Sequence, residues 1–155
     1  ESVNRYGDWL TGKVLDIGCN DGMAMEALQK LSEVTEVSGI DIDPNKVEKA
    51  VKKGLKASEG RLEELPYKDK EFDTVFCSHT FEHAEDGKKA AEEIMRIAKR
   101  AVIIVPIEEQ TDNAAHYNQI KSPEALKEFF PGAKVLKEEN PNRLEWEYVA
   151  VLDFP

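Results

Sequence analysis

The chain has 155 residues, a length that suits one globular domain with a sizeable buried core. Its 31 acidic and 21 basic residues give a formal net charge of −10, which disfavours nucleic acids and anionic membrane surfaces as partners. The sequence contains neither a membrane-spanning apolar run nor a signal-peptide pattern, and Cys19 and Cys77 lack metal or disulfide spacing. We therefore expect a single cytoplasmic domain over residues 1–155, with reduced thiols.

The first half of the chain alternates short apolar runs with amphipathic segments. A polar lead-in, in which Trp9 and Leu10 are expected to pack on the domain edge, precedes the first apolar run. Asp43-Pro44 is typical of a helix start, and Gly54 of a helix end. The expected elements, in order, are a strand over 13–17, a helix over 21–31, a strand over 36–42, a helix from 44 to 54 and a short strand over 55–58.

The second half continues the alternation and then changes character. The run 101–105 is continuously apolar, as in central parallel strands, whereas Asn140-Pro141-Asn142 is a turn signal that predicts an antiparallel hairpin. The expected elements are a strand over 72–77, a loop over 78–86, a helix over 87–99, a strand over 101–105, a loop over 107–121, a helix over 122–130 and strands over 133–138 and 144–154.

Five strands that alternate with helices, followed by a helix and a hairpin, predict an α/β fold. In such folds a parallel sheet carries helices on both faces, and ligands bind at the carboxyl ends of the strands. The segments that directly follow strands are therefore the candidate site, namely 16–22, 41–43, 59–62, 78–83 and the residues after Pro106.

The first of these segments is a glycine turn between a strand and a helix, where the backbone can approach a ligand closely. Asp16 ends the strand, and a carboxylate there favours a cationic ligand over a pyrophosphate. Asp41 stands about 25 residues later at the end of the next strand, where an acid accepts hydrogen bonds from ribose hydroxyls. Its other possible role, capping the following helix, is already filled by Asp43.

The dinucleotide fingerprint G-x-G-x-x-G fails here, because Asn20 and Met23 stand where its second and third glycines belong. The turn instead reads acid, apolar, Gly, small, Asn, any, Gly, and three further motifs follow it. The four stretches are Asp16-Ile17-Gly18-Cys19-Asn20-Asp21-Gly22, Gly39-Ile40-Asp41-Ile42-Asp43, Leu65-Pro66-Tyr67 before Phe72-Asp73, and Ser78-His79-Thr80-Phe81-Glu82-His83. Together they resemble the class I S-adenosylmethionine-dependent methyltransferases, in particular the type 11 methyltransferase domains, over residues 13–106.

The resemblance implies a Rossmann-like, doubly wound, mostly parallel seven-stranded sheet whose last strand, part of the C-terminal hairpin, is antiparallel. It implies S-adenosylmethionine as cofactor. The methionine part would lie on Asp16, Gly18, Cys19, Asn20 and Gly22, with Asp16 near its positive charge. Asp41 would bind the ribose, and Ile42 and Leu62 would enclose the adenine. Ser78 and His79 would line the side of methyl transfer.

Two departures from the family pattern concern the cofactor. Asn20 replaces the usual second glycine, and asparagine accepts left-handed backbone angles better than most residues. Arg61 stands where many relatives have an aspartate that accepts from the adenine amino group. Since arginine offers no acceptor, adenine recognition would fall to backbone atoms or to Glu63.

The function implied by the resemblance is in-line methyl transfer to an oxygen, nitrogen or carbon nucleophile. The acidic balance favours a small-molecule acceptor, and the sequence leaves its identity and the oligomeric state open. A protonated nucleophile needs a general base, for which His79, His83 and His116 are the candidates, with Glu82 behind them.

Three alternatives compete with this interpretation. One is a non-catalytic cofactor-binding or partner-activating module, favoured by Arg61 and by the absence of the longer N-terminal segment that covers the substrate in many relatives. Another is a nicotinamide-dependent oxidoreductase, which the failed glycine spacing disfavours. The third is an inverted zinc peptidase, because His79–His83 satisfies H-x-x-E-H. That chemistry needs both histidines on a long helix, whereas this segment directly follows a strand, so we expect no metal site.

Overall fold

The computed structural model describes residues 2–107, 115–140 and 145–155, and these form a sheet of seven strands in the order β3-β2-β1-β4-β5-β7-β6. The strands are β1 (Gly12–Ile17), β2 (Val34–Asp41), β3 (Ala57–Glu59), β4 (Phe72–Ser78), β5 (Ala98–Pro106), β6 (Lys134–Asn140) and β7 (Glu145–Asp153). All neighbouring strands pair in parallel except β7, which is antiparallel to both β5 and β6. The expected fold class and hairpin are confirmed, whereas Pro141 and Asn142 of the predicted turn lie outside the described residues.

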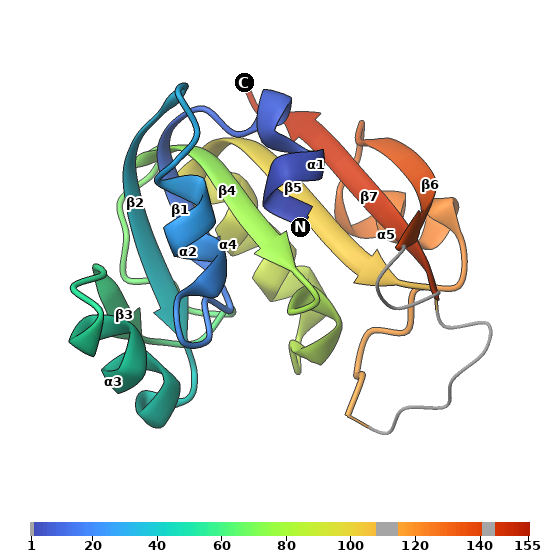
Figure 1. Ribbon diagram of the computed structural model, residues 1–155. Coiled ribbons are helices and arrows are strands. Elements are labelled where there is room, and N and C mark those ends of the chain that lie inside the picture. The colour runs from blue at the N-terminus through green and yellow to red at the C-terminus, as the bar shows by residue number, and fades with distance from the viewer. Residues whose placement is uncertain (1, 108–114, 141–144) are drawn as a thin grey trace.

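Helices cover both faces of this sheet. The α-helices are α1 (Ser2–Arg5), α2 (Met23–Leu28), α3 (Pro44–Lys52), α4 (Gly87–Ile97) and α5 (Pro123–Phe129), and the 3₁₀ turns are η1 (Gly7–Trp9) and η2 (Phe81–His83). Figure 1 shows α1 and α2 on one face, α4 and α5 on the other, and α3 beside the β2–β3 edge. None of the helices in the described part of the chain is long and apolar enough to cross a membrane.

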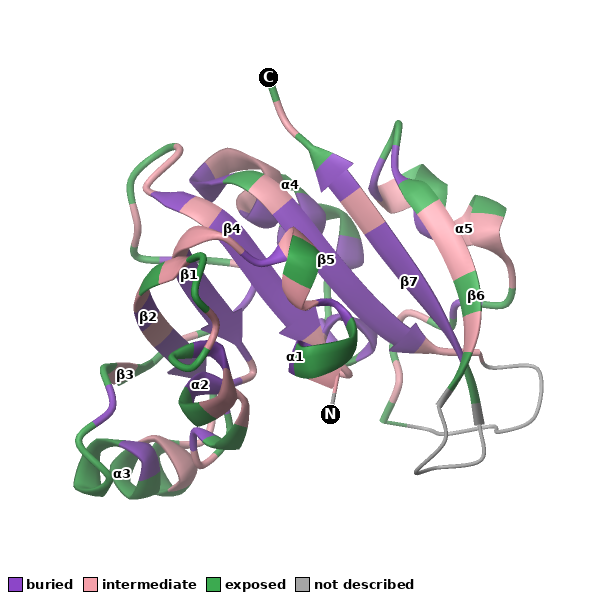
Figure 2. Cartoon of the chain, turned by 45° about the horizontal axis from the view of Figure 1, so that its top comes forward, coloured by how far each residue is buried: buried purple, intermediate pink, exposed green. Residues whose placement is uncertain are grey.

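Two apolar layers fill the space between sheet and helices, because successive strand residues point to opposite faces. Val14 and Phe76 pack under α1 and α2, whereas Leu15 and Val75 pack under α4 and α5. The central strands are accordingly buried on both faces, as the purple ribbon of Figure 2 shows for β4 and β5. This rigid double layer fixes the carboxyl ends of β1, β2, β4 and β5 at one edge.

Several boundaries differ from the sequence-based expectation. The helix predicted over 21–31 corresponds to α2, which ends at Leu28. Amides shortly after it bond to carbonyls three rather than four residues back, such as Leu31 N to Leu28 O at 3.1 Å. The helix over 87–99 ends at Ile97, since Ala98 already pairs with Phe72 in the sheet. The carboxyl ends of β1 to β5 nevertheless lie within one residue of the predicted positions.

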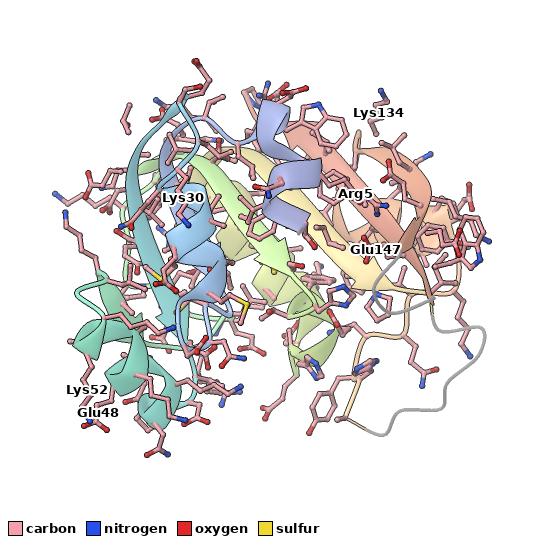
Figure 3. The ribbon with its side chains drawn as sticks, in the orientation of Figure 1. Arg5, Lys30, Glu48, Lys52, Lys134 and Glu147 are labelled. Atoms are coloured by element: carbon pink, nitrogen blue, oxygen red, sulfur yellow. The ribbon has the colours of Figure 1, made fainter. Side chains whose placement is uncertain are left out.

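The N-terminal segment, expected as a polar lead-in, contains the short helix α1 and a buried Tyr6. Tyr6 stacks on Trp9 with ring centroids 5.8 Å apart, and Leu10 is fully buried. The expected packing of Trp9 and Leu10 is thus confirmed. Tyr6 also brings α1 against β7, which places the beginning of the chain near the carboxyl edge of the sheet (Figure 3).

Candidate functional site

A cleft of about 490 Å³ opens at the carboxyl ends of β1, β2 and β4, on the edge where parallel α/β sheets bind ligands. The residues predicted from the sequence that line this cleft are Gly18, Asn20, Asp41, Ile42, Arg61, Leu62, Ser78, His79 and His83. The cleft walls also contain Lys46, Glu63, Thr80 and Glu85. The other predicted residues, Asp16, Cys19, Gly22 and His116, are not among the described residues that line the cleft.

The turn between β1 and α2 is shaped by three left-handed residues. Gly18, Asn20 and Gly22 have φ of 75°, 52° and 88°. A side chain on Gly18 would collide with the Thr80 hydroxyl, so glycine is required there by space as well as by backbone angle. Gly22 is the N-cap of α2 and therefore ends the turn. The expectation that Asn20 tolerates the left-handed angle is confirmed.

Cys19 contributes backbone rather than thiol to this turn. Its amide donates to the carbonyl of Ile40 at 3.1 Å, beside the bond from Gly18 N to the same oxygen at 2.8 Å. The side chain packs against Gly39, where any added Cβ would meet it. Burial raises the pKa of the Cys19 thiol to about 12, so it stays protonated and apolar.

Asp41 links the turn to the end of β2. One carboxylate oxygen accepts from Asn20 N at 2.8 Å and the other from Asp43 N at 2.9 Å. Asp43 separately caps α3 by accepting from Asn45 N at 2.9 Å. The predicted cap at Asp43 is confirmed, and Asp41, which does not cap α3, lines the cleft.

Asp16 is a buried carboxyl with an unsatisfied oxygen. The residue is 2% exposed, and its Oδ2 atom has no hydrogen-bond partner among the described residues. Burial, together with the charge of Asp41, raises the pKa of Asp16 to about 8. An unpaired buried acid costs stability, and a cationic or hydrogen-bond-donating ligand group offsets that cost.

Two apolar side chains face the cleft beyond Asp41. Ile42 is 58% exposed, which is unusual for isoleucine, and Leu62 is nearly buried. Arg61 also lines the cleft, and its guanidinium is 3.1 Å from a carboxylate oxygen of Glu85 and 3.7 Å from one of Glu63. An apolar slot edged by polar groups suits a flat heterocycle.

His79 directly follows β4 and is held by a residue that sequence reasoning missed. Its Nε2 atom lies 3.2 Å from Oε2 of Glu147, a β7 residue that is only 2% exposed. Glu147 also accepts from the Tyr6 hydroxyl at 3.2 Å and lies 3.7 Å from the Arg5 guanidinium, and Figure 3 labels Arg5 and Glu147 on adjoining elements. The sequence feature that could have indicated Glu147 is an acidic residue within the largely apolar sequence of β7.

The three histidines surround Glu82, which is 1% exposed. His79 Nδ1 lies 3.9 Å from Glu82 Oε1, and the rings of His83 and His116 meet edge to face at 4.7 Å between centroids. The structure thus brings all three candidate bases into one cluster, of which His79 and His83 reach the cleft. Burial raises the pKa of Glu82, while the nearby imidazoles lower it by a smaller amount.

The H-x-x-E-H segment does not form the helix that an inverted zinc peptidase requires. Residues Phe81–His83 make a single 3₁₀ turn, and His79 has a left-handed φ of 52°. The first histidine turns toward Glu147 and the second toward the carbonyl of Ala115. These two imidazoles consequently do not face one ion together in the way that motif needs.

A seven-stranded sheet in this order, with a glycine turn after β1 and acids at the ends of β1 and β2, defines a Rossmann-like methyltransferase fold. Residues 15–105 match the family model described as a methyltransferase domain. The chain belongs to this family, the class I S-adenosylmethionine-dependent methyltransferases. The resemblance found in the sequence motifs is thereby confirmed, and S-adenosylmethionine is the cofactor of the family.

Individual relatives agree with this assignment. The chain is 32% identical over 124 residues to norajmaline N-methyltransferase of Rauvolfia serpentina. This match covers 74% of this chain and 40% of that enzyme. The chain spans about a third to a half of the length of the curated relatives it matches.

Solved structures share the fold at low sequence identity. One comes from the complex between the Haloferax volcanii Trm112 methyltransferase activator and the putative methyltransferase, with a TM-score of 0.82, 18% identity and coverage of 99% of this chain and 89% of that one. Another is a SAM-dependent methyltransferase from Aquifex aeolicus, with a TM-score of 0.72, 22% identity and coverage of 96% and 87%.

Proposed function

We propose that this protein transfers a methyl group from S-adenosylmethionine to an oxygen, nitrogen or carbon nucleophile of a small-molecule acceptor. The observation that carries the proposal is the pair of acids at neighbouring strand ends: Asp41 facing the cleft and Asp16 buried with an unsatisfied oxygen. A ligand that carries a ribose and a separate positive charge would give each of these two acids a partner. The net charge of −10 supports a small acceptor over nucleic acid.

The cofactor would be held along the cleft by residues of the first three strand ends. Asp41 would accept from the ribose hydroxyls, and the backbone of Gly18 and Asn20, with Asp16 beneath, would hold the methionine part. Ile42 and Leu62 would enclose the adenine. Lys46 and Arg61 lie in the same wall, but neither offers an acceptor to the adenine amino group, so backbone atoms or Glu63 would accept from it.

When bound, S-adenosylmethionine supplies an electrophilic methyl group, and the protein's task is to position the acceptor and exclude water. Ser78, His79 and His83 line the cleft and would face the acceptor. The Nε2 atom of His79 faces the Glu147 carboxyl, which can accept a hydrogen from it. With that hydrogen on Nε2, Nδ1 would keep a lone pair that could take a proton from the acceptor, and we take His79 as the first candidate base to test.

The comparisons favour a nitrogen acceptor as the first to test, because norajmaline N-methyltransferase is among the relatives. A panel of small amines, phenols and carboxylic acids incubated with methyl-labelled S-adenosylmethionine would test the proposal. We expect label in at least one acceptor, and a rate at least about tenfold lower after His79→Gln if that residue is the base. Label transfer unaffected by the substitution would remove His79 from the mechanism.

A second candidate function is a domain that needs a protein partner for turnover. The similar Haloferax volcanii chain comes from a complex with a methyltransferase activator, and that observation supports a partner for this chain too. The distinguishing result is binding of S-adenosylmethionine without transfer to any acceptor in the panel. Transfer by the isolated chain would instead establish an independent enzyme.

A further inference from the structure

A second cluster of polar side chains lies beside the proposed cofactor cleft and has the composition of a metal site. Glu82, His83 and His116 each offer one possible ligand atom, and these three atoms lie within 4.8 Å of one another. His83 also lines the cleft, next to the residues on the proposed acceptor side. The cluster joins η2 to the segment after β5, so it forms only in the folded chain.

An independent observation at Glu82 points to a ligand. The side chain is almost wholly buried, and its Oε2 atom has no hydrogen-bond partner in the described part of the chain. Leaving a buried carboxylate oxygen unsatisfied is costly, and a coordinated cation removes that cost. The imidazole of His79 lies beside the other oxygen, Oε1, at 3.9 Å from its Nδ1 atom.

The geometry of His83 is that of an oriented metal ligand. Its Nδ1 atom lies 3.0 Å from the carbonyl oxygen of Ala115. A carbonyl can only accept, so Nδ1 carries the hydrogen and Nε2 keeps its lone pair. Imidazole ligands of metals are commonly oriented by such a bond from the second nitrogen to a backbone carbonyl.

We propose that Glu82, His83 and His116 bind a divalent transition-metal ion, with Zn²⁺ the first candidate. Two imidazoles and one carboxylate are a known set of three protein ligands for catalytic zinc, which leaves a further position for water or substrate. The donor atoms need small side-chain rotations to reach one ion, because zinc–ligand distances are about 2.0–2.2 Å. The sequence analysis expected no metal site, and a metal-binding measurement distinguishes that expectation from this proposal.

The position of the ion gives it a role on the acceptor side, an extension that rests on the proposed function. His83 borders both the cluster and the cleft, so the remaining coordination position is available to an acceptor oxygen or nitrogen. An ion there would orient an acceptor that carries a lone pair. Metal binding itself does not depend on that role, and the two can be tested separately.

The test is metal binding by the chelator-treated protein. Zn²⁺ affinity is measured by competition with a chromophoric chelator, and Co²⁺ is added as a spectroscopic substitute whose visible bands report its ligands. We expect one ion per chain, and at least tenfold weaker binding after His116→Ala and after Glu82→Gln. Mg²⁺ should compete poorly, because it prefers oxygen ligands.

His79→Asn is the matched control, because it removes the histidine on the other side of Glu82 and asparagine tolerates the same left-handed backbone. It should bind Zn²⁺ as the parent does. Thermal melting without metal verifies that each variant is folded. Equal binding by the parent and His116→Ala, a loss in His79→Asn as large as in His116→Ala, or Co²⁺–thiolate bands from Cys19 or Cys77 would each overturn the assignment.

Titration of the metal-free protein with S-adenosylmethionine separates this proposal from the proposed function. Cofactor binding without any Zn²⁺ binding would overturn the metal site alone. Zn²⁺ binding that follows the predicted variants, in a protein without cofactor affinity, would support the site and count against the methyltransferase activity.

Discussion

The Nε2 atom of His79 lies 3.2 Å from Oε2 of Glu147, so the end of β4 is held by a strand 68 positions later in the chain. The same carboxylate receives the Tyr6 hydroxyl from the N-terminal segment. Three distant parts of the sequence thus meet at one buried acid beside the cleft. Replacing either member of this pair should therefore alter the site without touching the cofactor-binding turn.

The backbone of His79 gives a first prediction. Its φ of 52° is uncommon for residues other than glycine, and asparagine, aspartate and histidine adopt it more readily than alanine does. His79→Ala should cost about 1–2 kcal/mol more in unfolding free energy than His79→Asn, since both lose the Glu147 contact but only alanine is strained there. Urea denaturation of the two variants measures this difference. Equal stabilities would mean that the left-handed conformation is absent in solution.

Gly18 and Gly54 provide a matched pair for the turn after β1. Both have positive φ, of 75° and 82°, but a Cβ on Gly18 would collide with Thr80, whereas nothing lies within 4 Å of one on Gly54. Gly54→Ala should cost about 1 kcal/mol from backbone strain alone. Gly18→Ala should cost at least about 2 kcal/mol and should also abolish cofactor binding.

Denaturant unfolding and cofactor titration of these two variants provide the comparison. If Gly18→Ala bound S-adenosylmethionine as well as Gly54→Ala does, the tight approach of the turn to Thr80 would not matter for the ligand.

Asp16 makes stability depend on pH. Its folded-state pKa of about 8 lies above the ordinary value of 3.8, so the folded protein holds an extra proton between these values. The stabilising effect of that proton is complete below about pH 4 and is lost as pH rises to 8. The unfolding free energy should therefore fall by up to about 1.4 kcal/mol per pH unit in this window.

Asp16→Asn removes this titration, so its unfolding free energy should fall less steeply from pH 5 to pH 8. Asp43→Asn, which keeps the cap of α3, is the control and should retain the parent's slope. Denaturant titrations at each pH measure the slopes. Identical slopes in Asp16→Asn and the parent would show that Asp16 is ionised across the whole range.

Local sequence patterns predicted most of the fold. The strand, glycine turn and helix around Gly18, the acid at the end of β2 and the C-terminal hairpin all depend on residues close together in the chain. Element boundaries were less predictable, because Ala98 is removed from the helix by its pairing with Phe72 across the sheet. No periodicity within the segment itself indicates such a contact.

In the candidate site, the residues at strand ends could be predicted from the sequence, whereas their long-range partners could not. Asp41 and Leu62 could be placed in the cleft from the motif order, since parallel strands end at one edge. Glu147 could not, because its partners Tyr6 and His79 are 141 and 68 positions away. The convergence of His83 and His116 on Glu82 likewise depends on the path of the chain after β5.

Cofactor binding is tested by a calorimetric titration with S-adenosylmethionine and S-adenosylhomocysteine, with NADH as the control ligand. We expect both methionine-derived ligands to bind and NADH not to bind. Asp41→Ala, which loses the proposed ribose acceptor, should bind them at least about tenfold more weakly. Asp43→Asn should bind like the parent. Folded protein that binds neither methionine-derived ligand would contradict the proposed cofactor site. An Asp41→Ala variant that binds both with unchanged affinity would also contradict it.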